Sequence, residues 1–273
     1  MKLLQSSKFF VLLLIIIGLT HCQQHKNSTH SIDWLKALSD PNIAIYDFKV
    51  TATLPHDPQA FTEGLFVENN LLYESSGLYN HSKLQRIDLR TGHVLAQLIL
   101  PQHYFAEGIA IYHDALYQLT YESHIALIYD KNTFQLIKTL SYPTQGWGLT
   151  TDGEQLVMSN GSEMLIFLDP HTFKAMRYLR VTYHNQPITL LNSLAFIQGK
   201  IFANIWGLDI IAIISPQTGH IEGLIDLRRL NPMHSVMSKE AVLNGIAYDE
   251  TTQEIIVTGK LWSQIYKIQL LKK

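Results

Sequence analysis

Five segments of the chain repeat one pattern of small, apolar and polar positions. Each starts with a small residue and an apolar one, then runs through a turn into a second apolar strand. The segments begin at Glu63-Gly64-Leu65, Glu107-Gly108-Ile109, Trp147-Gly148-Leu149, Asn192-Ser193-Leu194 and Asn244-Gly245-Ile246. The steps between successive small residues are 44, 40, 45 and 52 residues. The strands are rich in Val, Ile, Leu, Tyr and Phe, and helical periodicity is nearly absent, which excludes an α-solenoid.

A second landmark, a polar turn between two β-rich runs, interleaves with the first. The turns span Asp88–Gly92, Asp130–Phe134, Asp169–Phe173 and Ser215–Gly219. In each, Asp or Ser opens the turn by capping the backbone, and Gly or Phe closes it. About forty residues holding four short strands is the size of a propeller blade. The pattern therefore predicts an all-β fold, a five-bladed β-propeller.

The strand count predicts how the ring closes. After Gly245 only three strands fit, ending at Ile265–Leu270, while a spare strand, Ile43–Leu54, precedes the first blade. We expect this N-terminal strand to become the outer strand of the last blade, which removes an open sheet edge. The long irregular connection Arg228–Val242 is expected to fold over one face.

The first 40 residues differ from the body. Lys2 and Lys8 are followed by an apolar run, Phe9–Leu19, that is short for a membrane span but typical of a signal peptide. Cys22 follows in a context that resembles a lipobox, except that His21 occupies a position where a small residue is expected. We predict a signal peptide at 1–22, a tether at 23–40 and the propeller domain at 41–273.

This organisation implies export, with the protein periplasmic or lipid-anchored in the bacterial envelope, or secreted. Membrane attachment then runs through a lipidated Cys22. The alternative is cleavage by an ordinary signal peptidase nearby, with Cys22 incidental. Cys22 is the only cysteine of the chain, so an intramolecular disulfide is excluded.

Composition narrows the range of partners. The 273 residues are 47% hydrophobic, and 21 basic residues nearly balance 23 acidic ones. Because no basic stretch interleaves with aromatics, nucleic acid is not expected as a partner. No His-x-x-x-His pair or Gly-x-Ser-x-Gly elbow occurs in the body, so neither a transition-metal site nor a serine nucleophile is indicated. A structural Ca²⁺ held by oxygens near the central channel remains compatible with the sequence.

The repeats also predict where a site lies, because the first strand of each propeller blade lines the central axis. The position before each small residue carries a polar or aromatic side chain: Glu63, Glu107, Trp147, Asn192 and Asn244. The second strands end in a comparable set: Glu74-Ser75-Ser76, Gln118–Tyr121, Ser159-Asn160, Asn204–Trp206 and Thr258–Lys260. Carboxylates, amides, a lysine and aromatics around one mouth indicate a small-ligand site. The alternative is a wet channel whose polar groups only satisfy the backbone.

Several dispersed motifs resemble the plant and bacterial type of glutaminyl cyclase. They are His56-Asp57-Pro58-Gln59-Ala60-Phe61-Thr62-Glu63-Gly64-Leu65, Tyr73-Glu74-Ser75-Ser76-Gly77-Leu78-Tyr79, Gly146-Trp147-Gly148-Leu149, Ala203-Asn204-Ile205-Trp206, Leu243-Asn244-Gly245-Ile246-Ala247 and Val257-Thr258-Gly259-Lys260-Leu261-Trp262. The similarity runs in order from about Val50 to the C-terminus.

The resemblance implies a five-bladed propeller that converts the N-terminal glutamine of peptides to pyroglutamate and releases ammonia, without a transition-metal cofactor. A monomer acting on peptides or proteins is expected. Carried over by position, the family's essential acid falls on Glu74. Its pocket neighbours fall on Phe61, Glu63, Glu107, Trp147, Asn192, Asn204, Trp206 and Lys260, with Tyr121 in place of a pocket tryptophan.

The chemistry of ring closure suggests roles for these residues. One carboxyl group, expected to be Glu74, shuttles a proton if burial raises its pKa towards neutrality. Lys260, Asn192 or Asn244 supplies a donor to the developing oxyanion. Trp147 and Trp206 hold the glutamine side chain folded.

The chain departs from the family pattern at several positions. Glu63 replaces a Gln, Asn192-Ser193-Leu194-Ala195 replaces Asn-Glu-Leu-Glu, and Ser159-Asn160-Gly161-Ser162 replaces Ser-Asp-Gly-Ser. Two alternatives therefore stay open: a catalytically inactive propeller that binds a peptide or envelope partner, and a metal-dependent hydrolase such as a lactonase. The acids missing at Ser193 and Ala195 count against the hydrolase.

Overall fold

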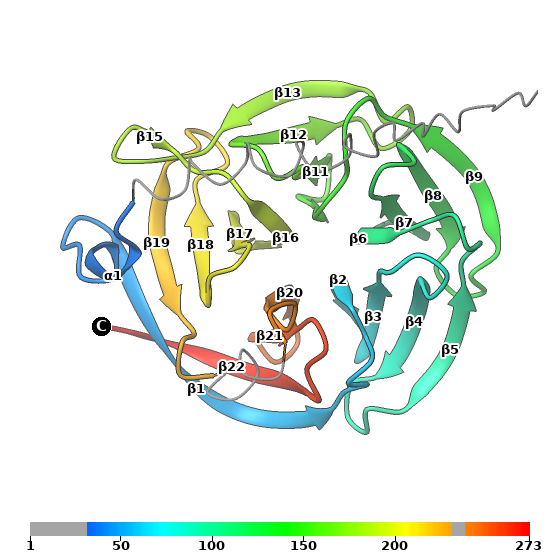
Figure 1. Ribbon diagram of the computed structural model, residues 1–273, viewed down its shortest axis with the longest axis horizontal. Coiled ribbons are helices and arrows are strands. Elements are labelled where there is room, and N and C mark those ends of the chain that lie inside the picture. The colour runs from blue at the N-terminus through cyan, green and yellow to red at the C-terminus, as the bar shows by residue number, and fades with distance from the viewer. Residues whose placement is uncertain (1–31, 231–237) are drawn as a thin grey trace, which may run out of the picture.

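A computed structural model describes residues 32–230 and 238–273. Strands are arranged radially around one centre, with β2, β6, β16 and β20 innermost (Figure 1). Three blades are separate four-stranded sheets, and an eight-stranded sheet holds two more, joined edge to edge. The fold is the predicted five-bladed propeller.

Each blade runs from an inner to an outer strand. Blade 1 consists of β2 (Thr62–Glu68), β3 (Leu71–Ser76), β4 (Lys83–Asp88) and β5 (Val94–Ile99). Blade 2 consists of β6 (Ala106–Tyr112), β7 (Ala115–Thr120), β8 (Ile125–Asp130) and β9 (Leu136–Ser141). Blade 3 consists of β10 (Leu149–Thr151), β11 (Leu156–Met158), β12 (Met164–Leu168) and β13 (Ala175–Arg180). A small hairpin, β14 (Thr182–Tyr183) and β15 (Gln186–Pro187), precedes blade 4.

The last two blades contain the ring closure. Blade 4 consists of β16 (Leu191–Ile197), β17 (Lys200–Ile205), β18 (Ile210–Ile214) and β19 (Ile221–Asp226). Blade 5 consists of β20 (Leu243–Asp249), β21 (Glu254–Gly259), β22 (Gln264–Lys272) and β1 (Ala44–Pro55).

The predicted closure by the N-terminal strand is confirmed. β1 pairs antiparallel with β22 from Tyr46 opposite Lys272 to Pro55 opposite Gln264. The sequence did not predict a second pairing, in which Ala44–Tyr46 lie parallel to Gly223–Ile225 of β19. β1 is therefore the outer strand of blade 5 and also pairs with the outer strand of blade 4, which protects both blades from edge-to-edge association at this joint.

The polar turns fold as the sequence predicts. Asp130 Oδ1 accepts hydrogen bonds from the backbone N–H groups of Asn132 (3.0 Å) and Thr133 (2.8 Å), and Asp169 does the same for its own turn. The closing residues Gly92 and Phe134 have φ of 74° and 57°. The closing position of this turn requires a left-handed backbone, which glycine adopts without strain and which Phe134 and Phe173 adopt at a steric cost.

The fold begins before residue 41. The short helix α1 (Trp34–Ala37) is capped by Asp33, whose side chain accepts from Lys36 N (3.1 Å). Ala37 and Leu38 are buried against the core between blades 3 and 4, and Trp34 stacks on Tyr183. The end of the predicted tether therefore packs on the propeller. The rest of it, the signal peptide with Cys22, and residues 231–237 of the Arg228–Val242 connection lie outside the described residues.

The inner strands approach one another more closely than side chains permit, which explains the repeated small residue. A Cβ added to Gly148 lies 2.0 Å from Asn192 O, one added to Gly108 lies 2.4 Å from Leu149 N, and one added to Gly64 lies 2.7 Å from Ile109 N. Blades therefore meet backbone to backbone near the axis. Farther out, five apolar clusters fill the wedges between neighbouring blades.

Polar ties link neighbouring blades around the axis. They are Gln118 Nε2 to Ser75 Oγ (2.8 Å), Gly108 N to Trp147 O (2.7 Å), Ser159 Oγ to Asn192 O (2.8 Å), Gly245 N to Asn204 Oδ1 (3.1 Å) and Asn244 Nδ2 to Thr62 O (2.9 Å). Together they cross all five joints. Several polar residues that the sequence places at the channel therefore also hold the ring together.

We expect Gly148→Ala to destabilise the fold by about 1–3 kcal/mol or more, because the added methyl meets a neighbouring backbone carbonyl that cannot retreat. Urea unfolding followed by circular dichroism measures the change. Gly199→Asn is the control, since a Cβ there meets nothing within 4 Å and Asn tolerates its φ of +78°. Equal stability of Gly148→Ala and the wild type contradicts the close approach.

Candidate functional site

Glu63 forms the centre of charge at one mouth of the ring. It is 1% exposed at the start of β2, and its Oε1 lies 2.5 Å from Lys260 Nζ. Its Oε2 accepts from Asn244 Nδ2 at 3.0 Å. Burial raises the pKa of Glu63 above its usual value, although the Lys260 ammonium and the Asn244 amide act in the opposite direction. The inner strand of blade 1 is thereby bonded to two elements of blade 5.

Glu107 occupies the equivalent position on β6 and has a different environment. It is 5% exposed, and its Oε2 is buried without a hydrogen-bond partner among the described residues. Burial raises the pKa of Glu107 well above its usual value, and the Glu63 carboxylate adds to the shift. Lys260 opposes the shift without cancelling it. The mouth therefore holds one carboxylate with a cationic partner and one carboxyl group that retains its proton to unusually high pH.

Aromatic rings form a wall beside these acids. Phe105 packs edge-on against Phe61 (centroids 6.1 Å apart) and Tyr79 (5.5 Å), and lies 5.8 Å from Tyr121. Lys260 Nζ lies 4.3 Å from the centre of the Phe61 ring, which adds a cation–π contact to its ion pair. Burial raises the pKa of Tyr121, with the charges of Glu122 and Glu107 adding to it. This wall gives the mouth an apolar side next to its charged one.

Three buried amides face the same region with incomplete hydrogen bonding. Within the described ranges, Asn192 Oδ1, Asn204 Nδ2 and Asn244 Oδ1 are buried without partners. Asn244 Nδ2 already donates hydrogen bonds to Thr62 O and Glu63 Oε2. Asn244 therefore offers an acceptor to a ligand, and the expectation that it donates to an oxyanion is wrong for this arrangement. Unsatisfied buried polar atoms concentrated in one place are typical of a binding site.

The two predicted pocket tryptophans differ in their settings. Trp147 is half-buried before β10; its Nε1 donates to Gln145 Oε1 (3.3 Å), and its ring lies against the backbone at Gly161. Trp206, just after β17, is 41% exposed. Trp147 is therefore held by packing, whereas Trp206 presents much of its ring to solvent.

Glu74 is buried on β3; its Oε1 is bonded to two side chains, whereas its Oε2 has no partner among the described residues. Its Oε1 is 2.9 Å from His56 Nε2 and 2.6 Å from Thr62 Oγ1, and the side chain has no exposed surface. Burial alone raises the pKa of Glu74, but the charge of His56 and these hydrogen bonds outweigh it, so the pKa lies below its usual value. The expectation that burial raises the pKa of Glu74 towards neutrality is therefore wrong, because the sequence did not reveal the histidine beside it.

Sequence reasoning assigned no role to two residues near the mouth, His56 and Phe105. His56 lies within a motif that carried the resemblance, but nothing in the sequence placed it against Glu74. Phe105 immediately precedes Ala106-Glu107, the start of a repeat, and this position could have indicated that its ring lies near the mouth. Within residues 32–230 and 238–273, no group of three or more His, Cys, Asp or Glu side chains is arranged to hold a metal ion.

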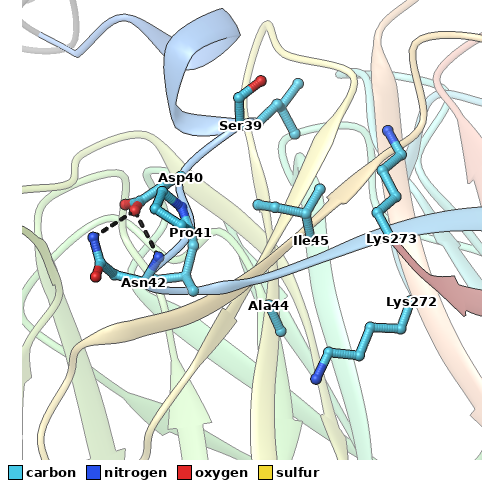
Figure 2. Close-up of a pocket in the computed structure, with 10 residues that line it drawn as sticks. Ser39, Asp40, Pro41, Asn42, Ala44, Ile45, Lys272 and Lys273 are labelled. Atoms are coloured by element: carbon cyan, nitrogen blue, oxygen red, sulfur yellow. Dashed lines mark hydrogen bonds between the residues drawn. The ribbon is translucent and has the colours of Figure 1, made fainter.

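Two cavities lie away from this mouth. One of about 520 Å³ is lined by residues 38–45, Lys272 and Lys273 at the outer rim, where Asp40 bonds Asn42 (Figure 2). Another, of about 390 Å³, includes Glu68, Asp152 and Asp249 at the opposite ends of the inner strands. Neither is lined by Glu63, Glu107 or Lys260. The buried charges therefore identify the candidate site better than cavity size does.

Comparisons with known proteins agree on one family. The family described as glutamine cyclotransferase matches residues 13–270. A glutaminyl-peptide cyclotransferase from Arabidopsis thaliana is 38% identical over 230 residues, which span 83% of this chain and 72% of that protein. The crystal structure of Myxococcus xanthus glutaminyl cyclase superposes with a TM-score of 0.80 at 31% identity, covering 85% of this chain and 99% of that one.

We expect Lys260→Met to destabilise the protein by about 3–5 kcal/mol, because it leaves the buried Glu63 carboxylate without its cation. Adding Glu63→Gln is expected to recover most of that loss. Thermal and urea unfolding measure both variants. The control is Lys200→Met, which breaks an exposed pair with Glu222 and is expected to cost about 0–1 kcal/mol. If the losses of stability from Lys260→Met and Glu63→Gln simply add in the double variant, the coupling between Lys260 and Glu63 is contradicted.

Proposed function

The chain belongs to the glutamine cyclotransferase family, and we propose that it cyclises the N-terminal glutamine of peptides or proteins to pyroglutamate, with Glu107 as the proton shuttle. The chain is an enzyme of the acyltransferase class. One observation supports the choice of Glu107: it is the buried carboxyl group at the mouth whose pKa is raised well above its usual value and whose Oε2 has no described partner.

The reaction needs a group that both takes and gives a proton. The α-amine of the substrate attacks the carbonyl carbon of its own side-chain amide, and the C–N bond to the amide nitrogen then breaks. The attacking nitrogen must lose a proton, and the leaving nitrogen must gain one to depart as ammonia. A single carboxyl group can take the proton from one nitrogen and give it to the other, which returns the group to its starting state. Such general acid–base catalysis contributes on the order of 10²–10⁴ in rate.

The neighbouring residues support this assignment. Lys260 carries three donors and uses one on Glu63, so another is available for the oxyanion that develops on the amide carbonyl. Asn192 Oδ1 and Asn204 Nδ2, which have no partners among the described residues, are proposed to bind polar atoms of the substrate. The wall formed by Phe61, Phe105 and Tyr121 gives the folded glutamine side chain an apolar surface. We propose that no transition metal takes part.

Glu63 adjusts the acid next to it. Its negative charge adds to the burial that raises the pKa of Glu107. The family pattern has a neutral Gln at this position. We therefore infer that Glu63 shifts the pH optimum of this enzyme upward relative to family members that carry the Gln.

Export and lipid attachment extend the proposal. The apolar run Phe9–Leu19 followed by Cys22 supports export to the periplasm or envelope, with attachment through a lipidated Cys22. No helix among the residues that the structure describes is long and apolar enough to cross a bilayer. A monomer is proposed, because β1 covers the sheet edges at the ring closure.

We expect Glu107→Gln to lower kcat on a Gln-initiated peptide by about 10²–10⁴-fold, measured as ammonia release with and without chelator. Chelator is expected to leave wild-type turnover unchanged. The same variant is expected to be more stable than the wild type at neutral pH. Because the pKa of Glu107 is higher in the folded state than in the unfolded state, the free energy of unfolding of the wild type falls as pH rises from the unfolded pKa through the folded one.

The control is Glu154→Gln, an exposed carboxylate in the turn after β10. Its activity and melting temperature are expected to match the wild type. Full activity in Glu107→Gln removes Glu107 from the mechanism. A folded wild type without turnover favours the inactive binding propeller, and loss of turnover with chelator favours the metal-dependent hydrolase.

We expect the full chain expressed in a bacterium to partition into the detergent phase and to carry a lipid-modified N-terminal cysteine, detected by mass spectrometry. Cys22→Ala is expected to move the protein to the aqueous phase while its cyclase activity is retained. An unmodified N-terminus elsewhere near residue 22 shows ordinary cleavage instead.

A further inference from the structure

The His56–Glu74 pair is the most deeply buried ionisable contact that the proposed mechanism leaves unused. The two side chains are 1% and 0% exposed, with Nε2 and Oε1 2.9 Å apart. The second carboxylate oxygen, Oε2, is buried without a partner among the described residues. Burying charged groups at such depth costs desolvation free energy, so we expect the pair to have a structural or functional role.

The hydrogen bonds define where the protons lie. His56 Nδ1 is 2.6 Å from the Trp262 carbonyl, which can only accept, so Nδ1 carries a proton. Thr62 Oγ1 donates to Glu74, as expected for a carboxylate. Thr258 Oγ1, 3.4 Å from Nδ1, donates to Gln264 O.

The charges around the pair agree with a cation beside an anion. Burial alone lowers the pKa of His56, but the Glu74 charge and hydrogen bonds outweigh it, and Asp57 adds to the net rise. Besides His56, Lys83 lowers the pKa of Glu74 through its charge. Lys83 is itself paired with Asp57 at 2.7 Å. The directions of both pKa shifts, together with acceptors facing both ring nitrogens of His56, favour an imidazolium beside a carboxylate.

The pair lies where the ring is closed. His56 directly follows β1, and its backbone N–H donates to Ser263 O (3.0 Å) in the loop between β21 and β22. Glu74 lies on β3 of blade 1. The pair therefore joins the closing strand, the β21–β22 loop and blade 1.

The segments that the pair holds carry the charged residues of the mouth. Lys260 lies two residues before Trp262, the acceptor of His56, and Leu261 N donates to Ala60 O (2.7 Å). Thr62, a donor to Glu74, directly precedes Glu63. Displacing either segment changes the 2.5 Å contact between Lys260 and Glu63, and with it the charge that Glu107 experiences.

We propose that His56 and Glu74 act as positioning residues of this enzyme, forming a buried ion pair that holds Lys260 and Glu63 in register beside Glu107. The proposal rests on the cyclase function and on Glu107 as its proton shuttle. In this proposal the pair acts without contacting the substrate. Its effect is transmitted through the two backbone segments, where a displacement of about 1 Å can cost on the order of 10²-fold in rate.

The pair also predicts a pH dependence. A raised His56 pKa means that its stabilising contribution is complete below the unfolded value of about 6.5 and is lost as pH rises through the folded pKa. The lowered Glu74 pKa means that its contribution is present above about 4.3 and is lost as pH falls through the folded pKa. Positioning therefore weakens as pH rises through the folded pKa of His56 and the imidazolium loses its proton.

The experiment measures kcat and KM for a Gln-initiated peptide across pH for the wild type, Glu74→Gln and His56→Gln. We expect Glu74→Gln to lower kcat by about 10–100-fold with little change in KM. The basic limb of its kcat–pH profile is expected to move to lower pH, because burial lowers the pKa of His56 once the carboxylate is gone. Glu222→Gln, which removes the carboxylate of an exposed pair, is expected to leave both quantities unchanged.

A folded Glu74→Gln with wild-type kcat and an unmoved basic limb overturns the proposal, even if Glu107→Gln confirms the function. Should the variants not fold, nitrogen NMR of the histidines in the wild type decides the question. A histidine charged above pH 7, with both ring nitrogens in hydrogen bonds, supports the proposal. The absence of any buried charged histidine at pH 7 overturns it, whatever the turnover assay shows.

Discussion

The close backbone approach of the inner strands around the axis sets the geometry of both the ring and its mouth. At Gly148 an added Cβ lies 2.0 Å from a neighbouring carbonyl oxygen, so the blades meet without side chains between them. The residue before each small position is then carried to one mouth of a narrow ring. This is why Glu63 and Glu107, separated by a whole blade in sequence, share one electrostatic environment.

The mouth combines two acids with one lysine. Lys260 is bonded to Glu63, and its charge offsets the burial of Glu107 only in part. Burying an acid that keeps its proton costs the fold stability near neutral pH, as is common for groups whose pKa values are adjusted to a catalytic task. The same mouth is the place where the ring closes, and the His56–Glu74 pair lies at that joint. Ring closure and site geometry therefore depend on the same segments.

Family membership and geometry answer different questions. The matches to glutamine cyclotransferases identify the reaction, which no arrangement of carboxylates specifies by itself. The geometry separates the acids that positional resemblance treated together. Glu74 has His56 Nε2 at 2.9 Å and a lowered pKa, whereas the burial of Glu107 and the neighbouring Glu63 raise the pKa of Glu107.

The fold and the ring of candidate positions could be predicted from the sequence, because both follow from a local repeat of a small residue, an apolar strand and a polar turn. The sequence also predicted the closing strand, since counting strands left one unpaired. The strongly raised pKa of Glu107 and the pairing of β1 with β19 became visible only in the three-dimensional structure. The pKa of a buried acid depends on groups a few ångströms away that are remote in sequence; Lys260 and Glu63 are 197 positions apart, and His56 and Glu74 meet across the closure of the ring.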